Sequence, residues 1–120
     1  MYKIPKTFNK QKLTGKIVQQ ISYASNVICI FFETSEYLKI MGGTFVFCQN
    51  EQTICCESIY PVKSDLGLLN LLDKAIINTD INDSRDTMTI TFDGNITLIL
   101  KGNDYYESYE VKLNDEYILI

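Results

Sequence analysis

The chain has 120 residues, of which 46% are apolar and 22% charged, and its formal net charge is −4. This composition is ordinary for one globular domain and excludes a disordered chain. An isoelectric point near 4.7 disfavours general nucleic-acid binding, because most of the surface repels phosphate. No apolar run approaches the ~18–20 residues of a membrane span, and the lysine-rich N-terminus does not resemble a signal peptide. A single cytoplasmic domain over residues 1–120 is therefore predicted.

Positive charge is concentrated at the N-terminus. Residues 1–16 contain five lysines and no acidic residue, whereas the rest of the chain has six basic and fifteen acidic residues, a net charge of −9. Residues 1–12 are predicted to form a flexible basic arm, because lysines at a chain end are usually solvated. The alternative is that Lys10 and Lys12 attract or bind an anionic partner.

Short strands are predicted throughout the first half of the chain. Residues 16–22 alternate weakly, and residues 26–34 are rich in β-branched and aromatic side chains, which is typical of a core strand. Residues 37–40 are expected to form another strand, and residues 44–48 and 52–57 to pair as a hairpin. The first half is thus predicted to be an antiparallel meander.

A single amphipathic helix is predicted over residues 64–77. Leucine, alanine and isoleucine recur there at the spacing of one apolar stripe along a helix. Ser64 can cap the first turn, and Asp65 lies where the helix dipole favours an anion. Gly67 weakens this helix slightly.

The clearest local pattern is a β-hairpin around Asp93-Gly94. Residues 87–92 alternate apolar side chains with threonine, and residues 96–100 resume the alternation after this strong turn signal. Residues 78–86 are polar and are predicted to form a loop or a short, twisted connection.

The end of the chain is expected to contain two further strands, at residues 107–113 and 117–120. The predicted fold class is therefore α+β, with antiparallel β-meander sheets of about eight short strands and one central amphipathic helix.

The side-chain inventory argues against catalysis. The chain has no histidine, which removes the commonest general base and the triads that depend on it. Its four cysteines contain no CxxC pair, and the adjacent Cys55 and Cys56 would face opposite sides of a strand, so zinc is not expected. We predict free, mostly buried thiols, no metal, no cofactor and no enzymatic activity.

Two acidic patterns suggest sites but lack the required spacing. Asp80, Asp83 and Asp86 resemble a calcium loop, yet its sixth and twelfth positions hold arginine and threonine in place of glycine and glutamate. Glu107 and Glu110 could form a catalytic carboxylate pair, but their odd separation on a strand directs them to opposite faces. Solvated or hydrogen-bonded carboxylates are predicted in both cases.

Tyrosines crowd the last sixteen residues of the chain, and such side chains either complete a core or anchor a partner. Core completion is expected for at least two of them. The candidate partner-binding or ligand-binding residues are Tyr105, Tyr106, Glu107, Tyr109, Glu110, Lys10 and Lys12.

Three segments in the second half follow a recognisable order. Leucine-rich residues 66–75 precede ITFDGNITL at residues 90–98, which fits apolar-x-Phe-x-Asp-Gly-x-x-Leu, and Tyr-Glu-Ser-Tyr follows at residues 106–109. This order resembles a family of small bacterial proteins of unknown function with a Tyr-Glu-Ser-Trp motif, over roughly residues 63–113, with tyrosine in place of tryptophan at position 109. The resemblance implies an α+β fold and a bacterial or phage setting, and it implies no mechanism.

Two functions are predicted. The first is a non-catalytic binding protein of the immunity or inhibitor type, which neutralises a protein partner such as a toxin or effector by covering it. The alternative is a phage anti-defence sponge, an oligomer that sequesters a small anionic nucleotide signal through the N-terminal lysines and the tyrosines. Short-stranded sheets leave open edges, so a homodimer or higher oligomer is also expected.

Overall fold

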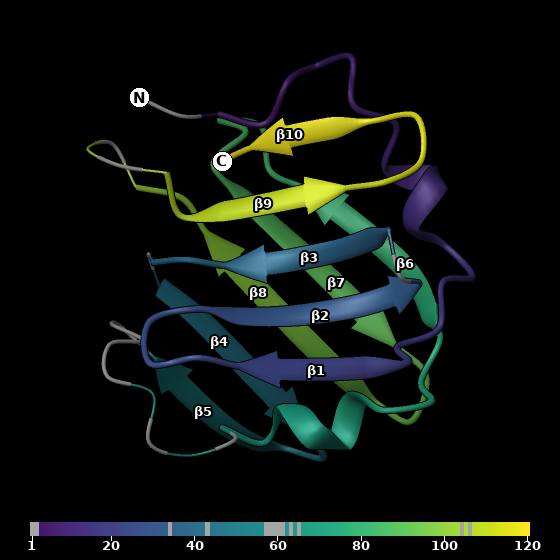
Figure 1. The fold of residues 1–120 in the computed structure, drawn as a ribbon, viewed down its shortest axis with the longest axis vertical. Helices are drawn as coiled ribbons and strands as arrows, with labels where there is room; N and C mark the ends of the chain where they lie inside the picture. Colours follow the sequence, from purple (N-terminus) through teal and green to yellow (C-terminus); the bar gives the residue numbers. More distant parts are fainter. Residues whose placement is uncertain are drawn as a thin grey trace.

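The chain folds into two stacked β-sheets. The computed structural model describes residues 3–33, 35–42, 44–56, 62, 64, 66–103, 105 and 107–120. These residues contain ten strands in two five-stranded antiparallel sheets. Figure 1 shows one sheet in front of the other, with the two strand directions crossing obliquely. Two short 3-10 turns are the only helical elements of the described chain, and neither could span a membrane.

The first sheet has the strand order β1-β2-β3-β9-β10 and lies in front in Figure 1. Its strands are β1 (Gln20–Tyr23), β2 (Ile28–Glu33), β3 (Glu36–Ile40), β9 (Tyr109–Lys112) and β10 (Tyr117–Leu119). The chain leaves this sheet after β3 and returns at β9, which pairs directly with β3. Residues from both halves of the sequence therefore share this sheet.

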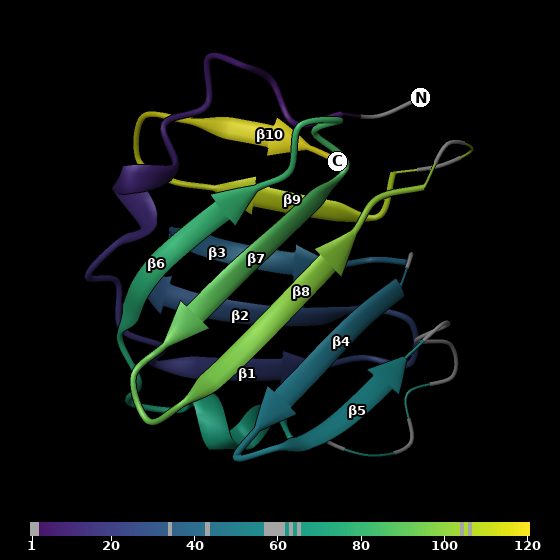
Figure 2. The same ribbon diagram turned by 180° about the vertical axis from the view of Figure 1, so that it is seen from behind.

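The second sheet has the order β5-β4-β8-β7-β6 and faces the viewer in Figure 2. Its strands are β4 (Thr44–Gln49), β5 (Gln52–Cys56), β6 (Ile76–Ile81), β7 (Thr87–Phe92) and β8 (Ile96–Lys101). The predicted hairpin around Asp93-Gly94 is confirmed as β7–β8, with Phe92 opposite Ile96. Gly94 and Asn95 supply the positive φ angles of its turn.

One apolar core fills the space between the sheets. Alternate residues of the central strands point inward, as the burial of Ile28, Ile30 and Phe32 in β2 illustrates. The N-terminal segment adds Ile4 and Phe8 to this core, and the short turn η1 (Lys10–Leu13) follows it. A flexible arm over residues 1–12 stays a prediction, and the burial of Ile4 and Phe8 speaks against it.

The predicted α+β class is wrong, because the helix predicted over residues 64–77 does not form. The described part of that span contains the four-residue turn η2 (Leu68–Leu71) and the start of β6. Gly67 and Leu66 have φ angles of 79° and 55°, and Asp73 has a φ of 67°. An α-helix of L-residues excludes such left-handed angles, so the chain cannot continue helically past either end of η2.

The leucine stripe of this segment serves a different packing. Leu68 and Leu71 are completely buried and pack in the hydrophobic core, while Leu69 and Leu72 are 45% and 38% exposed. A 3-10 turn brings residues three apart onto one side, so the same spacing that predicts a helix also suits this turn. The Ser64 hydroxyl accepts a hydrogen bond from the Leu66 backbone N–H within a local turn, and Asp65 lies outside the described residues.

Two further expectations about topology need correction. The first half is not one meander, because β2 and β3 belong to one sheet and β4 and β5 to the other. The predicted loop at residues 78–86 begins as the edge strand β6, where Thr79 points inward and is 2% exposed. A bulge between Ile76 and Asn78 interrupts the alternation of β6, which hides this strand in the sequence.

Candidate functional site

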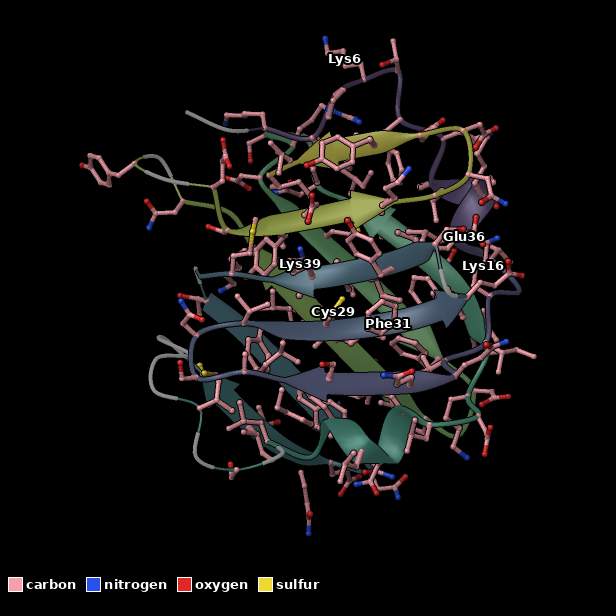
Figure 3. The ribbon with its side chains drawn as sticks, viewed as in Figure 1. Lys6, Lys16, Cys29, Phe31, Glu36 and Lys39 are labelled. Carbon is pink, nitrogen blue, oxygen red and sulfur yellow. The ribbon has the colours of Figure 1, made fainter. Side chains whose placement is uncertain are left out.

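The side of the first sheet that faces away from the core carries an ordered set of side chains, which we call the outer face. Cross-strand register arranges them in two rows. The first row is Gln20, Phe31, Tyr37, Lys112 and Tyr117, and the second is Ser22, Cys29, Lys39, Glu110 and Leu119. Figure 3 shows Cys29, Phe31 and Lys39 on this side of the sheet.

Glu110 is the most enclosed charged group of the outer face. It is 9% exposed, and its Oε2 lies 3.1 Å from the Lys39 Nζ. The Tyr117 hydroxyl donates a short hydrogen bond to Oε1 of the same carboxylate. Burial raises the pKa of Glu110, but the hydrogen bonds from Tyr117 and Lys39 outweigh burial and leave the pKa below its usual value. Glu110 is therefore an ionised carboxylate held by neighbours on two other strands.

Aromatic rings continue this arrangement toward β2. The rings of Phe31 and Tyr37 meet edge to face, with centroids 5.8 Å apart and an interplanar angle of 63°. The Lys39 Nζ lies 5.3 Å from the centroid of the Tyr37 ring, within the range of a cation–π interaction. These contacts restrict the rotamers of the Phe31, Tyr37 and Lys39 side chains.

Cys29 lies in the middle of the outer face, yet it is only 7% exposed. Burial raises the pKa of its thiol to about 11, despite the opposing effect of Lys39. A thiol with such a pKa is protonated at neutral pH and is a poor nucleophile. Cys29 therefore acts here as a small apolar packing residue.

Tyr109, a predicted binding residue, is buried between the sheets. Its hydroxyl donates to the Thr44 carbonyl of β4 at 2.5 Å and accepts from the Lys101 backbone N–H of β8 at 3.2 Å. It is 0% exposed, so it joins the two sheets and cannot contact a partner. Core completion, expected for at least two tyrosines, describes Tyr109 well.

The remaining predicted residues are not brought together. Tyr105 is 90% exposed on the connection between β8 and β9, Glu107 is exposed nearby, and Tyr106 lies outside the described residues. Lys10 and Lys12 lie in η1, at the opposite end of the first sheet from that connection (Figure 1). Of the six predicted residues that the structure describes, Glu110 is the one that belongs to the outer face.

The two N-terminal lysines are paired with acidic residues. Lys12 Nζ lies 2.7 Å from Asp115 and 3.2 Å from Glu116, and the hydrogen bonds to these carboxylates raise its pKa. Lys10 Nζ lies 3.8 Å from Asp80. Each of the two lysines therefore has a carboxylate neighbour that offsets part of its positive charge.

A groove of about 540 Å³ lies beside these lysines, and a buried ion pair lies close to it. Lys12, Lys16 and Glu33 are among the residues that line the groove. Lys16 Nζ lies 2.6 Å from the Oε1 of Glu36, which is 2% exposed and also accepts a hydrogen bond from the Asn114 N–H. Figure 3 shows Lys16 and Glu36 side by side at one end of the sheet. This pair holds the end of β3 in place.

The acidic run at residues 80–86 has a structural role. The Asp86 carboxylate accepts hydrogen bonds from Asn82, Ser84 and Thr87, and the Asn82 bond contributes most to lowering its pKa. Within the described part of the chain, no group of three metal-ligating side chains converges. This run closes the turn between β6 and β7.

Most residues of the outer face were not predicted from the sequence as site residues. Phe31, Tyr37 and Lys39 occur at alternate positions of predicted strands, so their shared side of each strand could be derived. Which side faces solvent depends on how the first sheet packs against the second, and the neighbours of Lys39 depend on the pairing of β3 with β9, residues about seventy positions apart. Local patterns do not contain that information.

The fold and the outer face together define a two-sheet, all-β protein with a preorganised aromatic and charged surface. Comparisons with protein-family models, with curated proteins and with solved structures found no match to this chain. The resemblance of residues 63–113 to the family with the Tyr-Glu-Ser-Trp motif therefore stays a prediction.

Proposed function

We propose that this protein is a non-catalytic binding protein of the immunity or inhibitor type, which covers a protein partner with its outer face. The observation that carries the proposal is the mutual fixing of Tyr37, Lys39, Glu110 and Tyr117 on a surface exposed to solvent. Side chains already held in place lose little conformational freedom on binding, so more of the contact energy becomes affinity.

The chemistry of the outer face suits a protein surface. Tyrosine is enriched among the residues that dominate binding energy at interfaces, and Tyr117 is 53% exposed at the border of the face. The positive charges of Lys39 and Lys112 lie on the same face as the negative charge of Glu110. This pattern favours a partner with complementary charges and disfavours a partner without them. A broad sheet face also provides contact area, as protein interfaces require.

The nucleotide-sponge alternative has less support. Its phosphate contacts were to come from Lys10 and Lys12, which are paired with Asp80 and Asp115. Its base contacts were to come partly from Tyr109, which is buried. The alternative stays a prediction that a ligand titration can test.

A matched pair of tyrosine variants tests the proposal. Tyr117→Ala removes an exposed tyrosine of the outer face, and Tyr105→Ala removes one that lies outside it. Once a partner has been isolated from the native host with the wild-type protein, calorimetry should give at least a tenfold weaker Kd for Tyr117→Ala and less than a twofold change for Tyr105→Ala.

Two outcomes would contradict the proposal. One is equal binding of the partner by wild type and Tyr117→Ala, with circular dichroism showing that the variant is folded. The other is a large thermal stabilisation of the wild type by cyclic oligonucleotides or adenosine-diphosphate-ribose, which would support the sponge instead.

A further inference from the structure

Three of the four edge strands are bordered at their ends by other parts of the chain or are very short. The start of β6 is covered by residues 15–17, since Gly15 N–H bonds the Ile76 carbonyl and Ile76 N–H bonds the Lys16 carbonyl, both at 2.8 Å. A bulge and the charged Asp80 interrupt the rest of this strand. Val62 N–H bonds the Ser25 carbonyl and Asp73 N–H bonds the Val18 carbonyl, so the chain borders both ends of β1. Strand β10 has only three residues, which is a common protection against edge pairing.

Strand β5 differs from these three edges in the part of the chain that the structure describes. Its five residues, Gln52 to Cys56, include no charge and no proline, and all but Cys56 are exposed. Ile54, at the centre of the strand, is 38% exposed. An uncharged, regular edge strand of this kind is a template for pairing with another strand.

The turn before β5 determines which backbone groups face the open edge. Asn50 and Glu51 have φ angles of 50° and 71°, as in the two-residue type I′ turn, so the flanking Gln49 and Gln52 form a hydrogen-bonded pair. Hydrogen bonding then alternates along the strand, and Thr53 and Cys55 direct their N–H and C=O groups away from β4. Among the described residues, no backbone hydrogen bond outside the β4–β5 pair reaches Thr53 or Cys55.

We infer that β5 pairs antiparallel with the β5 of a second copy of this chain, across a two-fold axis at Ile54. In this register Thr53 of each copy lies opposite Cys55 of the other, so every outward group of the two residues finds a partner. Ile54 lies opposite Ile54 of the second copy, and each covers the exposed part of the other. The two second sheets join into one ten-stranded sheet.

Symmetry favours a second copy over an unrelated strand. The chain carries a net charge of −4, and two copies repel each other over most of their surfaces. Residues 52–56 are neutral, so no like charges lie opposite each other within the paired strands themselves, and the acidic positions 51 and 57 lie just beyond them. The same surface on both copies gives the closed two-fold contact that is commonest among homodimers. The outer faces lie on the other sheet, so this inference does not depend on the proposed function.

Cysteine cross-linking tests the register. In a Cys55→Ser background, Ile54→Cys would place two cysteines opposite each other, where Cα atoms of such a pair lie about 4.5 Å apart and a disulfide can form. The matched control is Leu72→Cys in the same background, because Leu72 has the same 38% exposure as Ile54 and lies outside β5. We expect covalent dimers on non-reducing gels after mild oxidation for Ile54→Cys and monomers for Leu72→Cys.

Sedimentation equilibrium of the unmodified chain provides a second readout. A single added strand pair buries little area, so we expect a weak, concentration-dependent dimer at tens to hundreds of micromolar. Thr53→Pro removes an N–H that the β4 pairing does not use, and edge strands accept proline at such positions. This variant should keep its circular dichroism spectrum and bind a second copy at least tenfold more weakly.

Two results would overturn the inference. The first is a monomer mass for the unmodified chain at every concentration together with no cross-link for Ile54→Cys. The second is a dimer that survives Thr53→Pro unchanged, which would place the contact on another surface.

Discussion

Replacement of Lys16 by methionine would leave the buried Glu36 carboxylate without its counter-ion. Lys16 Nζ donates to Glu36 Oε1 at 2.6 Å, and the Glu36 side chain is 3% exposed. Removal of one partner from a buried ion pair typically costs about 3–5 kcal/mol. We expect Lys16→Met to lower the free energy of unfolding by about 3 kcal/mol at pH 7. This is the lower end of that range, because the Asn114 N–H still bonds Glu36 and Lys16 is partly exposed.

The pH dependence gives the prediction its sharpest form. The hydrogen bond from Lys16 lowers the pKa of Glu36 against the opposing effect of burial. A carboxyl with a lower pKa in the folded state contributes stability above its unfolded pKa of about 4.3, and loses that stability as the pH falls through the folded pKa. In Lys16→Met the lowering effect of Lys16 is lost while burial still raises the pKa of Glu36, so Glu36 takes up a proton more readily. The stability difference between wild type and variant should therefore shrink from pH 7 toward pH 3.

Urea unfolding followed by circular dichroism from pH 3 to pH 8 measures this difference directly. Lys6→Met is the matched control, since Lys6 is exposed and has no ion pair within the described part of the chain, and it should change stability little. Adding Glu36→Gln to Lys16→Met should recover more than half of the loss. A constant stability difference across the pH range, or a loss no larger than that of Lys6→Met, would refute the reasoning.

Three further outcomes follow from single contacts. Tyr109→Phe should lower the free energy of unfolding by about 1–3 kcal/mol in a urea titration, because two backbone groups lose the hydroxyl between the sheets. Gly67→Ala should lower the melting temperature, since φ is +79° and the added Cβ would lie 2.9 Å from the Phe47 ring; an unchanged melting temperature would contradict this. At pH 8 iodoacetamide should label the exposed Cys55 well before Cys29, because burial raises the pKa of the Cys29 thiol to about 11. Peptide mass spectrometry measures the order of labelling, and labelling of Cys29 first would contradict its role as a protonated packing residue.

The sequence predicted the fold best where the signal was local. The β7–β8 hairpin follows from strict alternation on either side of Asp93-Gly94, and the structure confirms it. The helix failed because the spacing of Leu68 and Leu71 fits a buried 3-10 turn equally well. Leucine and aspartate at positions 66 and 73 give no sign of their left-handed backbone, which tertiary packing imposes.

The candidate site was less predictable than the fold. Glu110 was among the predicted residues and lies on the outer face, but its partner Lys39 comes from a strand far away in the chain. The lysines at positions 10 and 12 were expected to offer free positive charge. Only the three-dimensional structure reveals that Asp80 and Asp115 lie beside them.

The pairing of β9 with β3 has a consequence for synthesis. All five strands of the second sheet precede residue 102, so that layer needs no residue of β9 or β10 to pair its strands. The first layer has three strands by then, and β3 has no neighbour on one side until Tyr109–Lys112 has emerged. Long-range pairing of this kind is slow, and an open strand edge promotes aggregation in the meantime. A chain truncated before Tyr109 would therefore contain every strand of the second layer and an unpaired β3 edge in the first.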